Sequence, residues 1–287
     1  MSPRLVFARG EERGITMKMK KWGIVAASFA LVASLGLFGC SSDEPADQQD
    51  PAGNDAAAYT LLEAGKLVVA TSPDYPPFEN LVDGEMVGFE IDLAKALGEK
   101  LGLTVEFKQL QFDAIVTAVA AGGQCDVGIS GFSITPERLE EVDFSDSYYV
   151  DDLGVAVMKD SGTTADNVDD VLAGEGVKIA VQSGTTGEAQ MLEDYPNATI
   201  VPYGNSTDSF AAMQAGQVDA VCTNLAVVNR TVAENYTDAE VVKTIATGEE
   251  YGVAVSKENP ELTKAINAAL AELEADGTIA EIAANWF

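Results

Sequence analysis

The stretch DVGISGFSITPER, from Asp126 to Arg138, decides the fold because it predicts a buried strand, a tight turn and the start of a helix in succession. The strand is expected over Val127 to Ser130 and breaks at Gly131. Thr135 is the expected N-cap of the helix, and Pro136 takes the first helical position, where a missing N–H does no harm. A strand that turns into a helix in this way leaves backbone N–H groups pointing into a crevice.

Arg138 falls in the first turn of this helix and is one of few cations in a very acidic sequence. A guanidinium beside unpaired N–H groups is a receptor for a carboxylate, because it donates two parallel hydrogen bonds. Ser130 and Ser133 add hydroxyl groups to the same turn. An arginine paired with Glu137 or Glu141 on a solvated helix face explains the same residues. The stretch alone does not decide between these two interpretations.

Composition excludes several classes of function. The 287 residues allow one large domain or two lobes, and the formal charge of −29 argues against nucleic acid or an anionic membrane surface as the partner. No His is present, which excludes Ser-His-Asp and Cys-His catalysis and removes the commonest metal ligand. Cys125 and Cys222 lie far apart at expected strand starts, so we expect small buried residues there; a disulfide between them stays open.

The first 58 residues precede the folded part of the chain. Residues 1–16 are interpreted as an upstream extension, and MKMKKWG after them has the positive charge of a signal-peptide start. The apolar run from Ile24 to Phe38 is too short and too rich in small residues for a spanning helix. It ends in Leu-Phe-Gly-Cys, which resembles a bacterial lipobox. This resemblance implies a signal peptide over 1–39 and a lipidated Cys40; an ordinary signal peptide cut nearby is the alternative.

Residues 40–58 are polar, contain Pro and Gly and lack aromatic residues before Tyr59, so they predict a flexible tether. The expected order is therefore a lipid anchor in the cell membrane, a spacer and an extracytoplasmic folded body.

From Tyr59 on, strands alternate with helices, which is typical of mostly parallel sheets flanked by helices. The expected strands are 66–71, 104–109, 127–130, 153–158, 178–182, 198–203, 220–223 and 252–255. The expected helices are 91–101, 113–121, 206–215, 224–235 and 260–276, with others starting at Pro136 and near Thr186 and a short last one ending at Phe287. Each half has a strand, a glycine turn and a helix, with Gly131 and Gly184 at the turns. Since ligands bind beyond the carboxyl ends of such strands, two facing lobes would close on a small molecule.

Several stretches resemble, in order and spacing, the polar-amino-acid-binding family of extracellular solute-binding proteins. They are LVVATSPDYPPFE, VGFEIDLAKALGEKLGL, FDAIVTAVAAGGQCDVGISGFSITPERLEEVDFSDSYY, IAVQSGTTGE and VDAVCTNLAVV. The resemblance covers about 61–287 and implies an α/β protein with two Rossmann-like lobes joined by two crossing strands, the type II periplasmic binding protein fold. The crossings are expected near 148–152 and 247–251. The first lobe would comprise 59–149 plus 250–287, and the second lobe 150–249.

The resemblance also implies a function. The protein would bind an extracellular amino acid between its lobes and deliver it, as a monomer and without metal or cofactor, to the permease of an ABC importer. Two alternatives stay open: a ligand-sensing subunit for a receptor, and an enzyme of the same fold that dehydrates cyclohexadienyl compounds. The absence of His and of an obvious general acid argues against the enzyme.

Nine positions carry over from the family as ligand-binding residues: Tyr75, Phe112, Ser130, Gly131, Ser133, Arg138, Gln182, Thr186 and Asn224. Arg138 matches the arginine that holds the ligand's α-carboxylate, with Ser133 and the Gly131 backbone beside it and Ser130 at the edge of the turn. Tyr75 and Phe112 match an aromatic pair that encloses the ligand, with plain core packing as the less favoured alternative.

The second lobe departs from the family pattern at one position. Thr186 matches a carboxylate contact at a helix N-terminus, where a bare turn is the alternative, and Gln182 matches a contact to the ligand's side chain. Asn224 stands where the family usually has an Asp that pairs with the α-ammonium. A neutral amide gives up the charge–charge attraction. Asp219 or Glu250 is then the expected ammonium partner, or the ligand depends less on its ammonium.

A position in the first lobe bears on the ligand's side chain. Ser72 stands where family members that bind basic amino acids often carry an acid. This favours a neutral or polar amino acid, although Asp74 would compensate for the missing acid.

Overall fold

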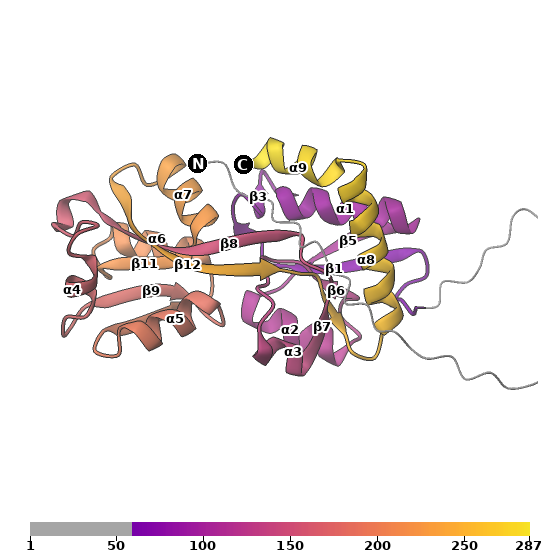
Figure 1. The fold of residues 1–287 in the computed structure, drawn as a ribbon, viewed down its shortest axis with the longest axis horizontal. Coiled ribbons are helices and arrows are strands. Elements are labelled where there is room, and N and C mark those ends of the chain that lie inside the picture. The colour runs from indigo at the N-terminus through magenta and orange to yellow at the C-terminus, as the bar shows by residue number, and fades with distance from the viewer. Residues whose placement is uncertain (1–58) are drawn as a thin grey trace, which may run out of the picture. The chain divides into compact units, whose positions relative to one another are not determined.

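The computed structural model describes residues 59–287. The predicted signal peptide, Cys40 and the tether lie outside the described residues. Within the described part, two five-stranded sheets each carry helices. The paired strands β8 and β12 belong to the second sheet and extend from it to the first lobe (Figure 1). The predicted α/β fold of two lobes joined by two crossing strands is confirmed.

The first lobe is built on the sheet β5-β1-β6-β13-β7. Its strands are β1 (Lys66–Thr71), β5 (Thr104–Gln109), β6 (Val127–Gly128), β7 (Val142–Phe144) and β13 (Ala254–Ser256). β1 is parallel to β5 and β6, whereas β13 is antiparallel to β6 and β7. The helices of this lobe are α1 (Phe89–Leu101), α2 (Phe112–Ala121), α3 (Pro136–Glu141), α8 (Pro260–Ala275) and α9 (Thr278–Trp286).

The second lobe is built on the sheet β10-β9-β11-β8-β12. Its strands are β8 (Tyr149–Met158), β9 (Lys178–Gln182), β10 (Thr199–Tyr203), β11 (Ala220–Asn224) and β12 (Ala239–Tyr251). A 3₁₀ turn η1 (Lys159–Ser161) precedes its helices, which are α4 (Val168–Leu172), α5 (Thr186–Asp194), α6 (Ser206–Gln214) and α7 (Leu225–Glu234). No helix within residues 59–287 has both the length and the apolar character needed to cross a membrane.

Each sheet has an apolar core on both faces, because side chains alternate along a strand. In β1, Leu67 and Val69 pack into the core that includes α1 and α8, while Val68 and Ala70 pack into the core that includes α2. The second sheet is covered in the same way by two further clusters. Continuous apolar strands such as these therefore require helices on both sides.

The two crossing strands pair with each other along their whole length. The antiparallel ladder runs from Tyr149 opposite Tyr251 to Met158 opposite Ala239, with irregular register between Ile245 and Glu249. The expected crossings near 148–152 and 247–251 lie at one end of this ladder. The residue boundaries of the lobes stay a prediction.

Most predicted elements are present within a few residues, but several features differ. The loop after β1 forms a small sheet of β2 (Asp74–Tyr75), β3 (Glu79–Val82) and β4 (Glu85–Val87). β7 and α4 were not predicted, and β12 is a strand of 13 residues where only a crossing near 247–251 was expected. β6 ends at Gly128, two residues before the predicted end, and β13 begins at Ala254. Exposed polar strands such as β3 and β12 lack the apolar run on which strand prediction rests.

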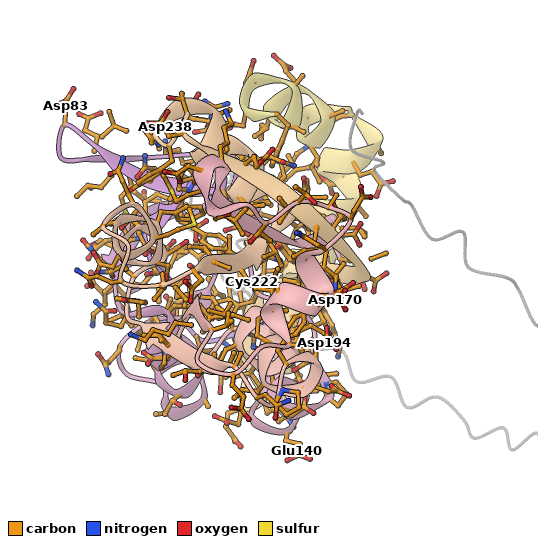
Figure 2. The ribbon with its side chains drawn as sticks, turned by 90° about the vertical axis from the view of Figure 1, so that its left-hand side faces the viewer. Asp83, Glu140, Asp170, Asp194, Cys222 and Asp238 are labelled. Atoms are coloured by element: carbon orange, nitrogen blue, oxygen red, sulfur yellow. The ribbon has the colours of Figure 1, made fainter. Side chains whose placement is uncertain are left out.

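Both cysteines of the described part are buried, whereas most of its acids lie at the surface. Cys125 and Cys222 are buried and free, as expected for small core residues, and no disulfide joins them. The net negative charge is carried at the surface instead. Figure 2 shows acid side chains projecting outward at Asp83, Glu140, Asp170, Asp194 and Asp238.

Gly88 fixes the entry of α1 against the loop before it. Its φ is 141°, and a Cβ there would lie 2.1 Å from the backbone oxygen of Phe78. The next two N–H groups, of Phe89 and Glu90, donate to the oxygens of Pro77 and Phe78. A side chain at position 88 would therefore push against backbone that cannot move aside, and it would displace Glu90.

We expect Gly88→Ala to destabilise the protein strongly. Gly65 is a matched control, because its φ is also positive, at 80°, but no atom lies within 4 Å of its added Cβ. Gly65→Ala should cost only the left-handed strain of about 1–2 kcal/mol, whereas Gly88→Ala adds a steric clash worth roughly 1–3 kcal/mol more. Equal losses for the two variants in urea unfolding would contradict this account.

Candidate functional site

Two buried acids, Glu79 and Glu90, accept hydrogen bonds from the turn between β6 and α3. Gly131 has a φ of 59°, and its N–H donates to both oxygens of Glu90 at 2.9 Å. The Ser130 hydroxyl donates to Glu79 at 2.6 Å and accepts the N–H of Ser72 at 3.1 Å. These groups of the turn, predicted as ligand contacts, are thus engaged within the first lobe. The two acids were not foreseen, because nothing in the local pattern marks them.

Glu79 and Glu90 form one buried acid pair. Tyr148 donates its hydroxyl to Glu90. Burial raises the pKa of Glu79 well above its ordinary value, and the neighbouring charge of Glu90 raises it further. We therefore take Glu79 to be protonated and Glu90 to be the acceptor of the Gly131 N–H. A neutral Glu79 lets the two acids stay buried side by side without mutual repulsion.

Arg138 lies between the two lobes. Its Nη1 donates to the backbone oxygen of Ser133 in the first lobe at 2.8 Å, and its Nη2 donates to that of Gly184 in the second lobe at 3.1 Å. The guanidinium carbon lies 5.5 Å from the ring centroid of Phe112 and 5.3 Å from that of Phe132. Burial lowers the pKa of Arg138.

No acid of residues 59–287 forms a salt bridge with Arg138. The alternative interpretation, a pair with Glu137 or Glu141, is therefore wrong. The cation is stabilised instead by two aromatic faces and two neutral carbonyl oxygens.

The two predicted aromatic residues belong to separate stacks. Phe112 stacks on Phe132, with ring centroids 4.8 Å apart and an interplanar angle of 21°. Tyr75 stacks on Phe78 at 6.2 Å and reaches across to the second lobe, where its hydroxyl bonds Thr223 at 2.9 Å and also donates to the Asn224 side chain. Phe132 is a component of the site that the sequence did not reveal.

Three predicted residues of the second lobe sit at the carboxyl ends of its strands. Gln182 ends β9, and its Nε2 donates to Gly204 at 3.4 Å, while its Oε1 is buried with no partner among residues 59–287. Thr186 is the first residue of α5, after Thr185, whose side chain caps the helix. Asn224 ends β11 and precedes α7. Parallel strands end at one edge of a sheet, which explains why these residues gather.

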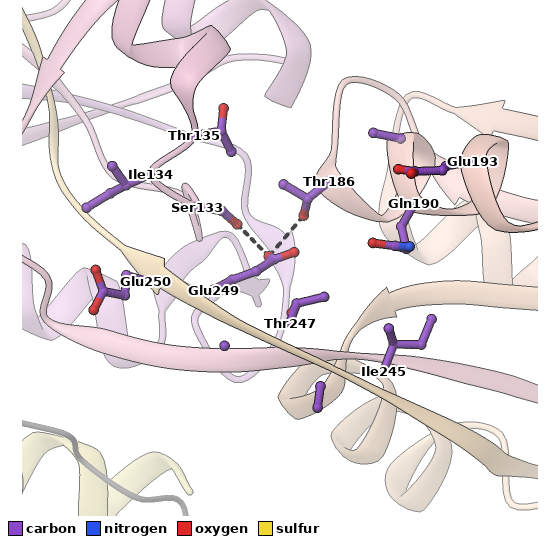
Figure 3. A pocket seen from close by; sticks show the side chains of 13 residues that line it. Ser133, Ile134, Thr135, Thr186, Gln190, Glu193, Ile245, Thr247, Glu249 and Glu250 are labelled. Atoms are coloured by element: carbon purple, nitrogen blue, oxygen red, sulfur yellow. Dashed lines mark hydrogen bonds between the residues drawn. The ribbon is translucent and has the colours of Figure 1, made fainter.

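Glu249 on β12 collects three of the predicted side chains. Its Oε2 accepts hydrogen bonds from Ser133 Oγ at 2.6 Å, Thr186 Oγ1 at 2.9 Å and Asn224 Nδ2 at 3.2 Å. Figure 3 shows this carboxylate between Ser133 and Thr186. The acids expected from the sequence near Asn224 were Asp219 and Glu250, the residue next to Glu249.

The two acids proposed from the sequence lie elsewhere. Asp219 precedes β11, at the opposite end from Asn224, and its carboxylate accepts the Lys178 N–H at 2.8 Å. The Glu250 side chain points away from Ser133 and Thr186 (Figure 3). Neither acid is placed to help Asn224, because strand ends are far apart and neighbouring strand residues face opposite sides.

A cavity of about 650 Å³ opens beside Glu249, between the start of α3, the exposed side of α5 and β12. Ser133 and Thr186 are the two predicted residues that line it, and Gln190 and Glu193 contribute polar groups from α5. The geometry as a whole is that of a binding protein with two lobes and polar groups converging from both.

Comparison with known proteins identifies the family. The sequence profile of the bacterial extracellular solute-binding proteins, family 3, matches residues 67–287, so the chain belongs to this family. The resemblance seen in the sequence is therefore confirmed, and the chain is a solute-binding protein rather than an enzyme.

The ABC transporter arginine-binding protein 1 of Escherichia coli (strain K12) is 32% identical over 229 residues, which cover 78% of this chain and 91% of that protein. The arginine-binding extracellular protein ArtP of Bacillus subtilis (strain 168) is 30% identical over 282 residues, covering 94% and 98%. Among solved structures, an ancestral arginine-binding protein bound to glutamine aligns with a TM-score of 0.72 at 38% identity, covering 78% of this chain and 99% of that one.

The raised pKa of Glu79 predicts a specific pH dependence. Since the folded-state pKa lies above the ordinary value of 4.5, the contribution of Glu79 to stability is complete below that pH and is lost as pH rises. Glu79→Gln keeps the neutral, hydrogen-bonding form at every pH. We expect its stability relative to wild type to increase with pH above about 4.5, by at most about 1.4 kcal/mol per pH unit. Urea unfolding from pH 4 to 8 measures this, and a constant difference would refute it.

Proposed function

We propose that the protein binds an amino acid outside the cytoplasm, in the cleft between its lobes, and delivers it as a monomer to the permease of an ABC importer. The observation that carries this proposal is the position of Arg138, a cation between the lobes whose only hydrogen bonds within residues 59–287 go to neutral carbonyl oxygens. The family supports it, as do the relatives, which include an ABC transporter arginine-binding protein of Escherichia coli and an arginine-binding extracellular protein of Bacillus subtilis.

A ligand carboxylate would improve on the present partners of Arg138. Hydrogen bonds between two charged groups are roughly twice as strong as those to neutral acceptors. The hydroxyls of Ser133 and Thr186 lie on the two sides of the cleft and would contribute donors. A micromolar dissociation constant corresponds to about 8 kcal/mol, and each hydrogen bond to a charged group contributes roughly 1.5–3 kcal/mol. A few such contacts suffice without metal or cofactor.

Closure of the lobes would depend on contacts that bridge them. Asp74 accepts the Ser206 N–H at 2.5 Å across the cleft, and Tyr75 bonds Thr223. A ligand shifts the equilibrium toward the closed form only by binding that form better. The Arg138 bond to Gly184 joins the same two lobes, so a carboxylate held there would link capture to closure.

The expectation of a neutral or polar ligand gains support from the first lobe. The Ser72 hydroxyl donates to Asp74 at 2.9 Å, and Asp74 is also bound to Ser206, so this acid is engaged rather than open to a cationic side chain. Burial raises the pKa of Asp74, which further disfavours a cation–carboxylate pair there. A basic ligand, as named for several relatives, is the competing outcome. The melting temperature of the protein, measured with each of the common L-amino acids in turn, distinguishes a neutral or polar ligand from a basic one, because a bound ligand raises it.

We expect Arg138→Ala to abolish amino-acid binding while the protein stays folded. Loss of two hydrogen bonds to a carboxylate removes about 3–6 kcal/mol, which is a weakening of roughly a hundredfold or more. Arg230→Ala is the matched control: it removes the same charge from α7, where Arg230 pairs with Glu234 at 2.8 Å. Titration calorimetry measures both variants, and retained affinity in Arg138→Ala would overturn the proposal.

The lipid anchor is a second part of the proposed function and rests on the sequence around Cys40. Cys40→Ala removes the thiol that would carry the lipid, so we expect the variant to move from the membrane to the soluble fraction of expressing bacteria and to incorporate no labelled palmitate. If a signal peptide is simply cut nearby, wild type and variant will both be soluble and unlabelled, and the anchor is ruled out.

A further inference from the structure

Arg138 would bind the carboxylate of an amino acid, so the α-ammonium group of the ligand needs a separate partner. A carboxylate on Arg138 brings an ammonium group one carbon away, and a buried cation needs a negative partner. Asn224 cannot fill this role, because both ends of its side chain are engaged: its Oδ1 accepts from Tyr75 and its Nδ2 donates to Glu249.

Three other carboxyl groups near the cleft, those of Asp74, Asp151 and Glu90, are committed elsewhere. Asp74 is held by Ser72 and Ser206. Asp151, opposite Glu249 in the ladder, accepts the Ala226 N–H at 3.2 Å, and burial raises its pKa to about 7. Glu90 is bound by Gly131 and Tyr148 beneath the turn.

Glu249 has a carboxylate oxygen, Oε1, that accepts no hydrogen bond from residues 59–287. All three of its hydrogen bonds end on Oε2, and none formed by residues 59–287 ends on Oε1. The residue also borders the 650 Å³ cavity, which gives a small group access to it, although Arg138 does not line that cavity. With the lobes placed as in this structure, three donors hold the carboxylate in one position, and such preorganisation favours binding.

Ser133 connects this acid to the arginine. Its backbone oxygen accepts from Arg138, and its hydroxyl donates to Glu249. Opposite charges thus stand on either side of one serine without forming a salt bridge to each other. A zwitterionic α-amino acid carries both charges and would offer each of these two groups an opposite partner.

The backbone of β12 aims Glu249 at the cleft. The ladder with β8 loses its register between Ile245 and Glu249, and within this irregularity Gly248 has a φ of 60° and donates its N–H to Asp152 at 2.9 Å. Extra residues in one strand re-aim the side chains that follow.

Resting on the proposed function, we infer that Glu249 is the residue that recognises the α-ammonium group of the ligand, in place of Asn224. The protein therefore selects zwitterionic α-amino acids over carboxylic acids of the same skeleton, with the negative charge supplied by a crossing strand.

The test combines a protein change with a ligand change. The probes are the L-amino acid that raises the melting temperature of the wild type most and the carboxylic acid with the same skeleton but no amino group. Glu249→Gln should weaken the amino acid roughly tenfold or more, because a neutral acceptor replaces a charged one, and should leave the des-amino acid nearly unchanged. Glu240→Gln, on the same strand but outside the lining of the cavity, should alter neither affinity.

A rescue variant separates recognition from folding. Asn224 touches the Glu249 carboxylate, so Asn224→Asp in the Glu249→Gln background returns a negative charge to within one hydrogen bond of the lost one and should recover most of the affinity. Unchanged or tighter binding of the amino acid by Glu249→Gln would overturn the inference while leaving the proposed function intact. A wild type that no amino acid stabilises contradicts both.

Discussion

A partly buried cation that forms no salt bridge within residues 59–287 is the constraint on which the site depends. The chain carries 46 acidic residues against 17 basic ones, so an arginine near its surface would be expected to find an acid. Arg138 instead lies over Phe112 and Phe132 and donates to two carbonyl oxygens. Aromatic faces attract a cation without neutralising it. The guanidinium therefore stays positive, oriented and open to a stronger acceptor.

The support for this arrangement lies one layer deeper in the first lobe. Glu90 fixes the Gly131 N–H, and Glu79 fixes the Ser130 hydroxyl, so the turn that carries Ser133 is bound from inside rather than by a ligand. Burying two acids is expensive unless one of them is neutral and both find donors. The first lobe bears this expense directly under the turn and gains a rigid platform on which Arg138 and Ser133 keep their positions.

Local chemistry was predictable from the sequence, and pairing between distant segments was not. The Thr135 cap, the proline at the first position of α3 and the left-handed Gly131 all follow from neighbours within a few residues. Phe132 and Glu79 could be recognised as parts of the site only from the tertiary fold. In the sequence, Phe132 is an ordinary apolar residue just after the glycine turn, and Glu79 is part of a proline-rich loop. The family resemblance supplied the nine candidate positions, but it held no information on Glu249, which reaches them only through the irregular register of β12.

The place of Glu249 also bears on how recognition is linked to closure. Its three donors come from both lobes, with Ser133 in the first and Thr186 and Asn224 in the second. β12 itself belongs to the connection between them, so rotation of one lobe must alter at least one of these bonds. An acid at the end of β11 would move with the second lobe alone, whereas an acid on the crossing strand has its full set of partners only when the lobes meet. Because a ligand favours a conformation only through contacts that differ between states, a charge placed there makes ammonium binding itself sensitive to closure.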